Sequence, residues 1–192
     1  MIRIIGIDPG SRRTGYGIVD VSGATINYVT SGIVRLPEDS LPERLQIIFD
    51  AVSQLIEEYK PAVMSIEDVF MSINPRGALK LGQARGASIL AGTNAKLTVS
   101  EYSPRSVKLA VVGTGAADKK QIQMMVASLL KLPSEPSEDA ADALAVAICH
   151  GHSMRSQKLM SEAGVKGFSR GKNLLPQPQR LTFDCAYYDH DI

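Results

Sequence analysis

The chain has no tryptophan, few aromatic residues and only two cysteines, and each scarcity limits what the protein can be. Aromatic residues make up 5% of its 192 residues, so aliphatic side chains and alanine must fill the core. Cys149 and Cys185 lack the paired spacing of zinc or redox motifs. They are therefore expected to be free thiols, which predicts a reducing, cytoplasmic location.

Long apolar segments are also missing. No run of apolar residues approaches the roughly 20 needed to span a bilayer, and the N-terminus leads directly into a predicted strand rather than a signal peptide. We therefore expect no membrane partner. The hydrophobic and charged fractions, 44% and 21%, are those of a globular protein long enough to bury one core.

The formal net charge is only +1, but the charges are unevenly distributed along the chain. Residues 38–68 hold eight acidic residues against two basic ones, whereas residues 71–131 hold nine basic residues against two acidic ones. Such segregation permits one strongly positive face, as expected for a protein that binds a polyanion. The alternative is a solvated surface on which the charges happen to be separated.

Apolar alternation and turn signals predict an α/β fold. Five strands are predicted, at 2–8, 14–20, 26–34, 62–67 and 97–102. Helices are predicted over 41–59, 75–94, 104–112, 118–130 and 138–153. The first three strands form a meander, and the crossover through the first helix predicts that the fourth strand joins the sheet in parallel.

Two segments have unusual composition. The helix over 75–94 contains four glycines, and each interior glycine costs up to ~1 kcal/mol relative to alanine. Close backbone approach would compensate for this cost, either inside one subunit or in a dimer contact. Residues 156–192 show little periodicity, and we predict a flexible C-terminal tail after a single domain over 1–155.

Four carboxylates are the most informative residues. Asp8 and Glu67 each end an apolar strand, where an unpaired buried carboxylate is costly. Asp139 and Asp142 lie three apart, on one side of an alanine-rich helix. Two strand ends and one helix can gather these charges into one pocket, which a multivalent cation would stabilise. Oxygen ligands favour Mg²⁺ or Mn²⁺ over zinc.

Parts of this carboxylate pattern also occur in proteins without such a pocket. Acidic residues are common near helix starts, because the helix dipole favours them there. The turn after Asp8, Pro9-Gly10-Ser11, also resembles the phosphate turn of actin-like and sugar-kinase ATPases. Those folds require a second domain with another glycine-rich loop, and this chain is too short to contain one.

Three long segments resemble the RuvC family of bacterial Holliday junction resolvases. They are GIDPGSRRTGYGIV at 6–19, IEDVFMSINPRGALKLGQARG at 66–86 and EDAADALAVAICH at 138–150, in the order and spacing of the family. The resemblance covers about residues 1–155. It implies a ribonuclease H-like fold, a five-stranded mixed sheet flanked by helices. It also implies a homodimer that nicks two opposed strands of four-way junction DNA, in homologous recombination and DNA repair, alongside the branch-migration proteins RuvA and RuvB.

The resemblance also implies roles for individual residues. Asp8, Glu67, Asp139 and Asp142 occupy the catalytic metal-ligand positions, with two Mg²⁺ ions per subunit and Mn²⁺ as a substitute. Phe70 occupies the position of an aromatic residue that stacks on bases, and Lys108 and Lys119 those of basic residues near the phosphates. Arg76 and Lys80 are weaker DNA-binding candidates, and Glu138 and Asp68 are second choices among the acids.

The leading hypothesis is therefore a metal-dependent endonuclease that resolves Holliday junctions by paired symmetric nicks. A second is another ribonuclease H-like nuclease, acting on RNA–DNA hybrids or other branched DNA. A third is a junction-binding protein without catalysis, which would have no need of four clustered carboxylates.

Overall fold

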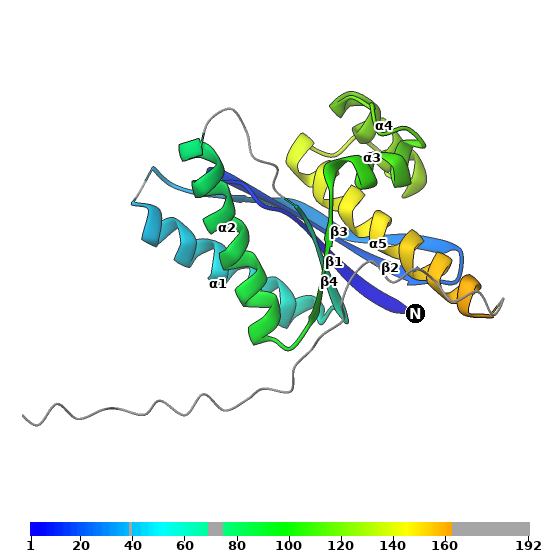
Figure 1. The fold of residues 1–192 in the computed structure, drawn as a ribbon, viewed down its shortest axis with the longest axis horizontal. Coiled ribbons are helices and arrows are strands. Elements are labelled where there is room, and N and C mark those ends of the chain that lie inside the picture. Colours follow the sequence, from blue (N-terminus) through cyan, green and yellow to red (C-terminus); the bar gives the residue numbers. More distant parts are fainter. Residues whose placement is uncertain (39, 69–74, 163–192) are drawn as a thin grey trace, which may run out of the picture.

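The computed structural model describes residues 1–38, 40–68 and 75–162. Its centre is a five-stranded mixed sheet in the order β3-β2-β1-β4-β5 (Figure 1). The strands are β1 Ile2–Asp8, β2 Arg13–Ser22, β3 Thr25–Arg35, β4 Val63–Glu67 and β5 Thr98–Tyr102. The helices are α1 Leu41–Tyr59, α2 Pro75–Asn94, α3 Pro104–Val112, α4 Lys119–Leu129 and α5 Glu138–Glu162.

The pairing of the strands confirms the predicted topology. β1, β2 and β3 form an antiparallel meander, and β4 joins β1 in parallel after the crossover through α1. β5 extends the sheet in parallel beside β4. Because β1 and β4 run in the same direction, their carboxyl ends lie at the same edge of the sheet.

Helices cover both faces of the sheet: α1 and α2 lie on one side, and α3, α4 and α5 on the other (Figure 1). β1 is therefore buried on both faces, and its side chains alternate between two cores. Ile4 packs in the core beneath α5, while Ile5 and Ile7 pack with Ile48 and Val52 of α1. This burial explains why β1 is a continuous apolar run that ends only at Asp8.

Glycines let α5 lie unusually close to the sheet. A Cβ atom built on Gly6 would stand 2.2 Å from the carbonyl oxygen of Ala143, and one on Gly15 would stand 2.0 Å from the carbonyl oxygen of Asp139. No side chain fits in either place. Bare backbone at these two positions therefore sets the distance between the sheet and the first turns of α5.

The last helix is longer than its sequence predicts. The helix predicted over 138–153 continues to Glu162, so His150 and His152 lie in its interior. Residues 154–162 contain good helix formers and no proline or glycine, so nothing stops the helix there. Residues 156–162, the first part of the predicted flexible tail, are therefore helical. Residues 163–192, including Cys185, lie outside the described residues.

The glycines of α2 differ in their surroundings. A Cβ atom on Gly92 would stand 2.8 Å from the Met64 side chain, as the prediction of close approach requires. At Gly82 and Gly86 a Cβ atom would meet nothing within 4 Å among the described residues. For these two glycines, the prediction of close backbone approach inside one subunit is therefore wrong. No helix among the described residues is long and apolar enough to cross a membrane.

Candidate active site

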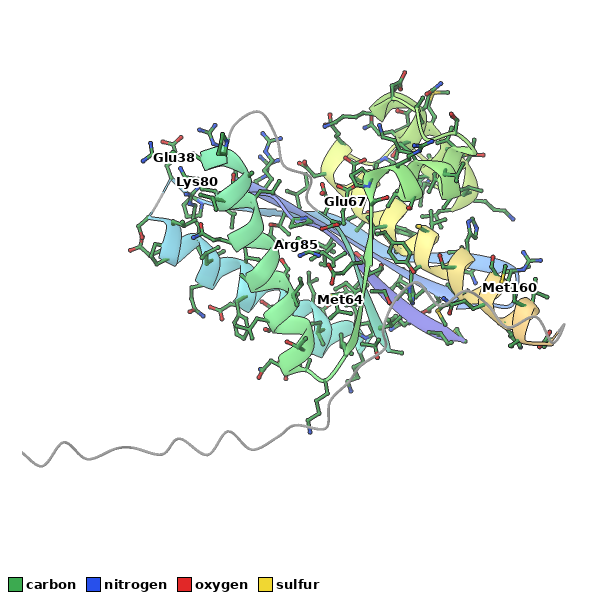
Figure 2. All side chains as sticks on the ribbon, in the orientation of Figure 1. Glu38, Met64, Glu67, Lys80, Arg85 and Met160 are labelled. Carbon is green, nitrogen blue, oxygen red and sulfur yellow. The ribbon has the colours of Figure 1, made fainter. Side chains whose placement is uncertain are left out.

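Two of the predicted acids meet at the carboxyl edge of the sheet. Ile7 of β1 lies beside Ile66 of β4 in parallel register, so the residues that follow them, Asp8 and Glu67, are neighbours. Figure 2 shows Glu67 at this edge, between the two groups of helices. The backbone of Glu67 is fixed from behind, because Arg85 Nε of α2 donates a 3.1 Å hydrogen bond to its carbonyl oxygen.

The third and fourth acids come from the first turns of α5. Asp8 is paired across the antiparallel ladder with Gly15, and the backbone of Asp139 rests directly on Gly15. Asp142, one turn further along α5, lines the same cavity as Asp8 and Glu67. The cavity has a volume of about 310 Å³, and Lys108 and Lys119 also line it.

The turn after Asp8 is held by its own polar groups. Thr14 is buried, and its hydroxyl donates a 3.2 Å hydrogen bond to the carbonyl oxygen of Gly10. This bond closes the loop between β1 and β2 tightly beside the carboxylate.

Repulsion among the acids is visible in their pKa values. Burial, followed by the charges of Glu67, Asp142 and Asp139, raises the pKa of Asp8 to about 8. Burial and the charge of Asp142 raise the pKa of Glu67 to about 7, although Lys108 and Lys119 oppose the shift. Burial also raises the pKa of Asp142. The two lysines therefore compensate the negative charge of the pocket only in part.

Asp139 stands somewhat apart from the other three acids. It does not line the cavity, and its carboxylate lies 3.8 Å from Arg13 at the start of β2. Within the described residues, no group of three acidic, histidine or cysteine side chains is arranged to hold a metal ion as it stands. Carboxylates that share a pocket repel one another.

The second-choice acids are engaged in ion pairs instead. Glu138 pairs with Lys119, which raises the pKa of that lysine. Asp68 lies 3.6 Å from Arg85, which also pairs with Glu101. Arg85 is thus a structural residue that braces β4 and β5, rather than a free basic side chain.

The basic candidates fall on two sides of the molecule. Lys108 of α3 and Lys119 of α4 border the acid pocket, whereas Arg76 and Lys80 are exposed on α2, across the sheet, and do not line it (Figures 1 and 2). The basic residues of 71–131 therefore lie on helices from both sides of the sheet, and a single positive face remains a prediction. Phe70 lies outside the described residues.

Arg13 has no role in the sequence interpretation, yet it approaches Asp139. The signal for it is the pair Arg12-Arg13, placed directly after the turn that follows Asp8. The buried histidine, by contrast, has a structural partner: His150 Nδ1 and the Tyr102 hydroxyl lie 2.8 Å apart.

The comparisons with known proteins all identify the same family. The family described as "Crossover junction endodeoxyribonuclease RuvC" matches residues 4–150. A curated relative of that description from Teredinibacter turnerae is 55% identical over 176 residues, covering 89% of this chain and 98% of the relative.

Solved structures agree. Thermus thermophilus RuvC, solved in complex with Holliday junction substrate, is 32% identical with a TM-score of 0.77, covering 82% of this chain and 97% of that one. The yeast mitochondrial Holliday junction resolvase, 12% identical, superposes with a TM-score of 0.62 and covers 83% of each chain. The yeast likeness supports the ribonuclease H-like fold alone.

Proposed function

Because the chain belongs to the RuvC family of crossover junction endodeoxyribonucleases, we propose that its acid pocket hydrolyses one phosphodiester bond in each of two opposed strands of a Holliday junction. The chain is thus an endonuclease of DNA recombination and repair. The main support for placing catalysis in this pocket is that Asp8, Glu67 and Asp142 converge on one cavity bordered by two lysines.

Metal dependence is general in this family, and the side chains of the pocket fit a hard cation. All the candidate ligands are carboxylate oxygens, from Asp8, Glu67, Asp139 and Asp142, and burial together with the charges of the neighbouring acids raises the pKa of Asp8. We propose two Mg²⁺ ions per subunit, with Mn²⁺ as a substitute. Bound there, such ions activate water and stabilise the departing oxygen of a phosphodiester.

The two lysines have a different task from the acids. Lys108 and Lys119 bring positive charge to the same cavity, where they would attract and orient the phosphodiester against the carboxylates. Lys119 is held by Glu138, so its ammonium group is kept at the rim before DNA arrives. None of the acids needs to attack phosphorus itself, and their proposed role is to hold the cations.

A homodimer would present two such pockets to the two-fold pattern of a junction. The face of α2 supports this proposal: Leu79 and Leu90 are 69% and 60% exposed. Gly82 and Gly86, which lie on the same stripe, leave open space where a partner helix could approach. An apolar groove of about 530 Å³ between α1 and α2 adjoins them.

The dimer proposal predicts the effect of charge on this stripe. Leu79→Lys combined with Leu90→Lys should give a monomer in analytical ultracentrifugation and uncoordinated single nicks instead of paired ones. Leu109→Lys, at a leucine of α3 that is 57% exposed, is the matched control and should remain dimeric. An unchanged mass for the double variant would remove the interface from this face.

The cellular setting follows from the family rather than from any surface of the chain. We propose that the enzyme acts in the cytoplasm, on junctions processed together with RuvA and RuvB.

The function itself is tested by substrate choice. A four-way junction, a flap and an RNA–DNA hybrid are offered at equal concentration with Mg²⁺, and the products are mapped at nucleotide resolution. We expect symmetric nicks in opposed strands of the junction, and none from Asp8→Asn, which should still bind it. Preferred cleavage of the hybrid or flap would favour another ribonuclease H-like nuclease, and binding without any cleavage would indicate a non-catalytic junction binder.

A further inference from the structure

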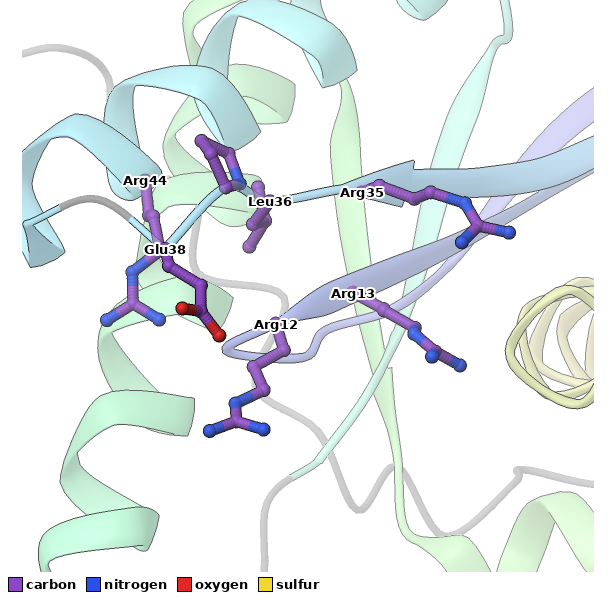
Figure 3. Close-up of a pocket in the computed structure, with 7 residues that line it drawn as sticks. Arg12, Arg13, Arg35, Leu36, Glu38 and Arg44 are labelled. Atoms are coloured by element: carbon purple, nitrogen blue, oxygen red, sulfur yellow. The ribbon is translucent and has the colours of Figure 1, made fainter.

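A second charged cavity, which none of the four acids lines, lies at the same end of the sheet. Its volume is about 550 Å³, and it is lined by an arginine cluster together with Leu36, Pro37 and Glu38. The arginine cluster consists of Arg12, Arg13, Arg35 and Arg44 (Figure 3). Four positive charges therefore face one negative charge, an imbalance that an anion would relieve.

Two members of the cluster oppose each other directly. Arg13 of β2 and Arg35 of β3 are partners across the antiparallel ladder. Like charges at such positions lie about 5 Å apart at Cβ and destabilise the sheet. Figure 3 shows both side chains extending in the same direction, toward α5. Binding of an external anion by both guanidinium groups would explain why such an unfavourable pair is present here.

Arg44, on the other side of the cluster, is hydrogen-bonded to the turn that follows Asp8. Arg44 Nη1 donates a 2.9 Å hydrogen bond to the carbonyl oxygen of Ser11, which ties α1 to the loop after Asp8. Its Nε atom is buried and has no hydrogen-bond partner among the described residues. Arg44 thus fixes the position of the cluster.

The remaining arginines lack the partners that a structural role would require. Within residues 1–38, 40–68 and 75–162, the side chains of Arg12 and Arg35 form no hydrogen bond or ion pair. Arg13 has only its long contact of 3.8 Å with Asp139, and its side chain is 62% exposed. Three exposed guanidinium groups are therefore available to a ligand. Guanidinium forks match phosphate oxygens in paired hydrogen bonds.

The location of the cluster indicates which phosphates it meets. Arg13 approaches Asp139 from the β2 side of the acid pocket, while Lys108 and Lys119 border that pocket from α3 and α4. Positive charge consequently flanks the acids on two sides. A strand laid across the turn that follows Asp8 would pass from the lysines to the arginines.

We infer that the arginine cluster binds the sugar–phosphate backbone of the strand being cut, at phosphates beyond the one held between the acids and lysines. This inference rests on the proposed function and adds to it a second anchoring site. An open cluster built from two strand ends, a turn and a helix suits an extended polyanion better than an enclosed small anion. The cluster would hold the strand in register while the pocket acts.

The salt dependence of binding tests the inference. Junction affinity is measured by fluorescence anisotropy between 50 and 200 mM salt, with EDTA present so that no strand is cut. The double variant Arg12→Ala/Arg35→Ala should reduce the slope of log K against log salt by about 1.8, since each lost phosphate contact removes about 0.9. The loss of affinity across this fourfold salt range should then be roughly twelvefold smaller than for the parent.

Arg155→Ala is the matched control. Arg155 is exposed on α5, about 24 Å along the helix axis from Asp139, and its removal takes away the same charge as the loss of either arginine alone. The control should keep the parent slope. An unchanged slope for the double variant, or an equal change in the control, would overturn the inference.

A second measurement needs no variant and so does not depend on folding. Single methylphosphonates, which lack the phosphate charge, are placed along the cut strand of the junction and binding is measured for the unmodified protein. We expect sensitivity at phosphates separate from the scissile one, and loss of that sensitivity in the double variant. Sensitivity confined to the scissile phosphate would refute the proposal that the arginine cluster binds other phosphates. Wild-type nicking in Mg²⁺ is scored separately, so failure of the proposed function is distinguishable from failure of this inference.

Discussion

Replacing Asp8 with asparagine should stabilise the metal-free protein, although it removes a residue that the enzyme needs. The pKa of Asp8 rises from 3.8 to about 8 on folding, because the side chain is buried among other acids. A raised carboxyl pKa means that the folded chain keeps a proton that the unfolded chain releases. The folded state is therefore penalised increasingly as the pH rises above 3.8.

The size of this free-energy penalty follows from the difference between pH 7 and the pKa of Asp8 in the unfolded chain. At pH 7 the 3.2 units above the unfolded value correspond to about 4 kcal/mol, at 1.36 kcal/mol per unit. Treating this as an upper bound, we expect Asp8→Asn to raise the Tm in EDTA by up to about 8–16 °C, since 1 kcal/mol shifts the Tm of a chain this size by about 2–4 °C. The gain should shrink as the pH is lowered toward 4.

Thermal melts with and without Mg²⁺ complete the test. Saturating Mg²⁺ should stabilise the wild-type protein by mass action and the variant much less. Asp50→Asn, at an exposed acid of α1, is the control and should change stability by less than about 0.5 kcal/mol. If Asp8→Asn melts below the wild type at pH 7 in EDTA, the acids are not under electrostatic strain and the argument for a cation pocket fails.

Three further predictions concern the support of the site. Gly15→Ala should reduce the cleavage rate about a hundredfold or more, because its Cβ atom would displace the backbone of Asp139 by more than 1 Å. Asp20→Asn should lower stability by about 1 kcal/mol at pH 7. Hydrogen bonding to Arg3 lowers the pKa of Asp20, so this difference is present at neutral pH and disappears as the pH falls below that lowered pKa. Lys119→Ala should weaken junction binding and reduce the salt slope by about 0.9.

Each of these has a control. Gly17→Ala also crowds α5, against Leu144 rather than Asp139, and should lose stability with a smaller loss of rate. Equal rates for the two glycine variants would contradict the positioning argument. Chemical denaturation at pH 7 and at a pH below the lowered pKa of Asp20 tests Asp20→Asn, and a difference that persists in that acid condition would rule out the ion pair as its source. For Lys119, a slope equal to the parent's would remove this lysine from the DNA interface.

Much of the fold could be predicted from the sequence because the local signals agree. Ser40 caps α1, with its backbone N–H donating to Glu43 at 2.8 Å, and Asp118 caps α4 by accepting from the N–H of Gln121. The apolar run before Asp8 and the one before Glu67 read as buried parallel strands, and parallel strands bring their ends together. The meeting of these two acids therefore follows from topology.

Other features depend on tertiary packing that no local pattern encodes. Gly15 looks like an ordinary turn glycine, and only the close approach of α5 reveals that it seats Asp139. Arg85 reads as one more basic residue, yet it donates to the carbonyl oxygen of Glu67. Arg35 and Arg44 are separated from Arg12 by more than 20 residues in sequence, so their cluster appears only once the meander and α1 are assembled.

The central claim is that carboxylates from β1, β4 and α5 hold cations around a DNA phosphate. Anomalous diffraction from crystals soaked in Mn²⁺ tests it most directly. The account predicts anomalous density within ligand distance of Asp8, Glu67 and the acids of α5, and its absence from crystals of Asp8→Asn. Mn²⁺ density elsewhere, with none at Asp8 under saturating conditions, would contradict it.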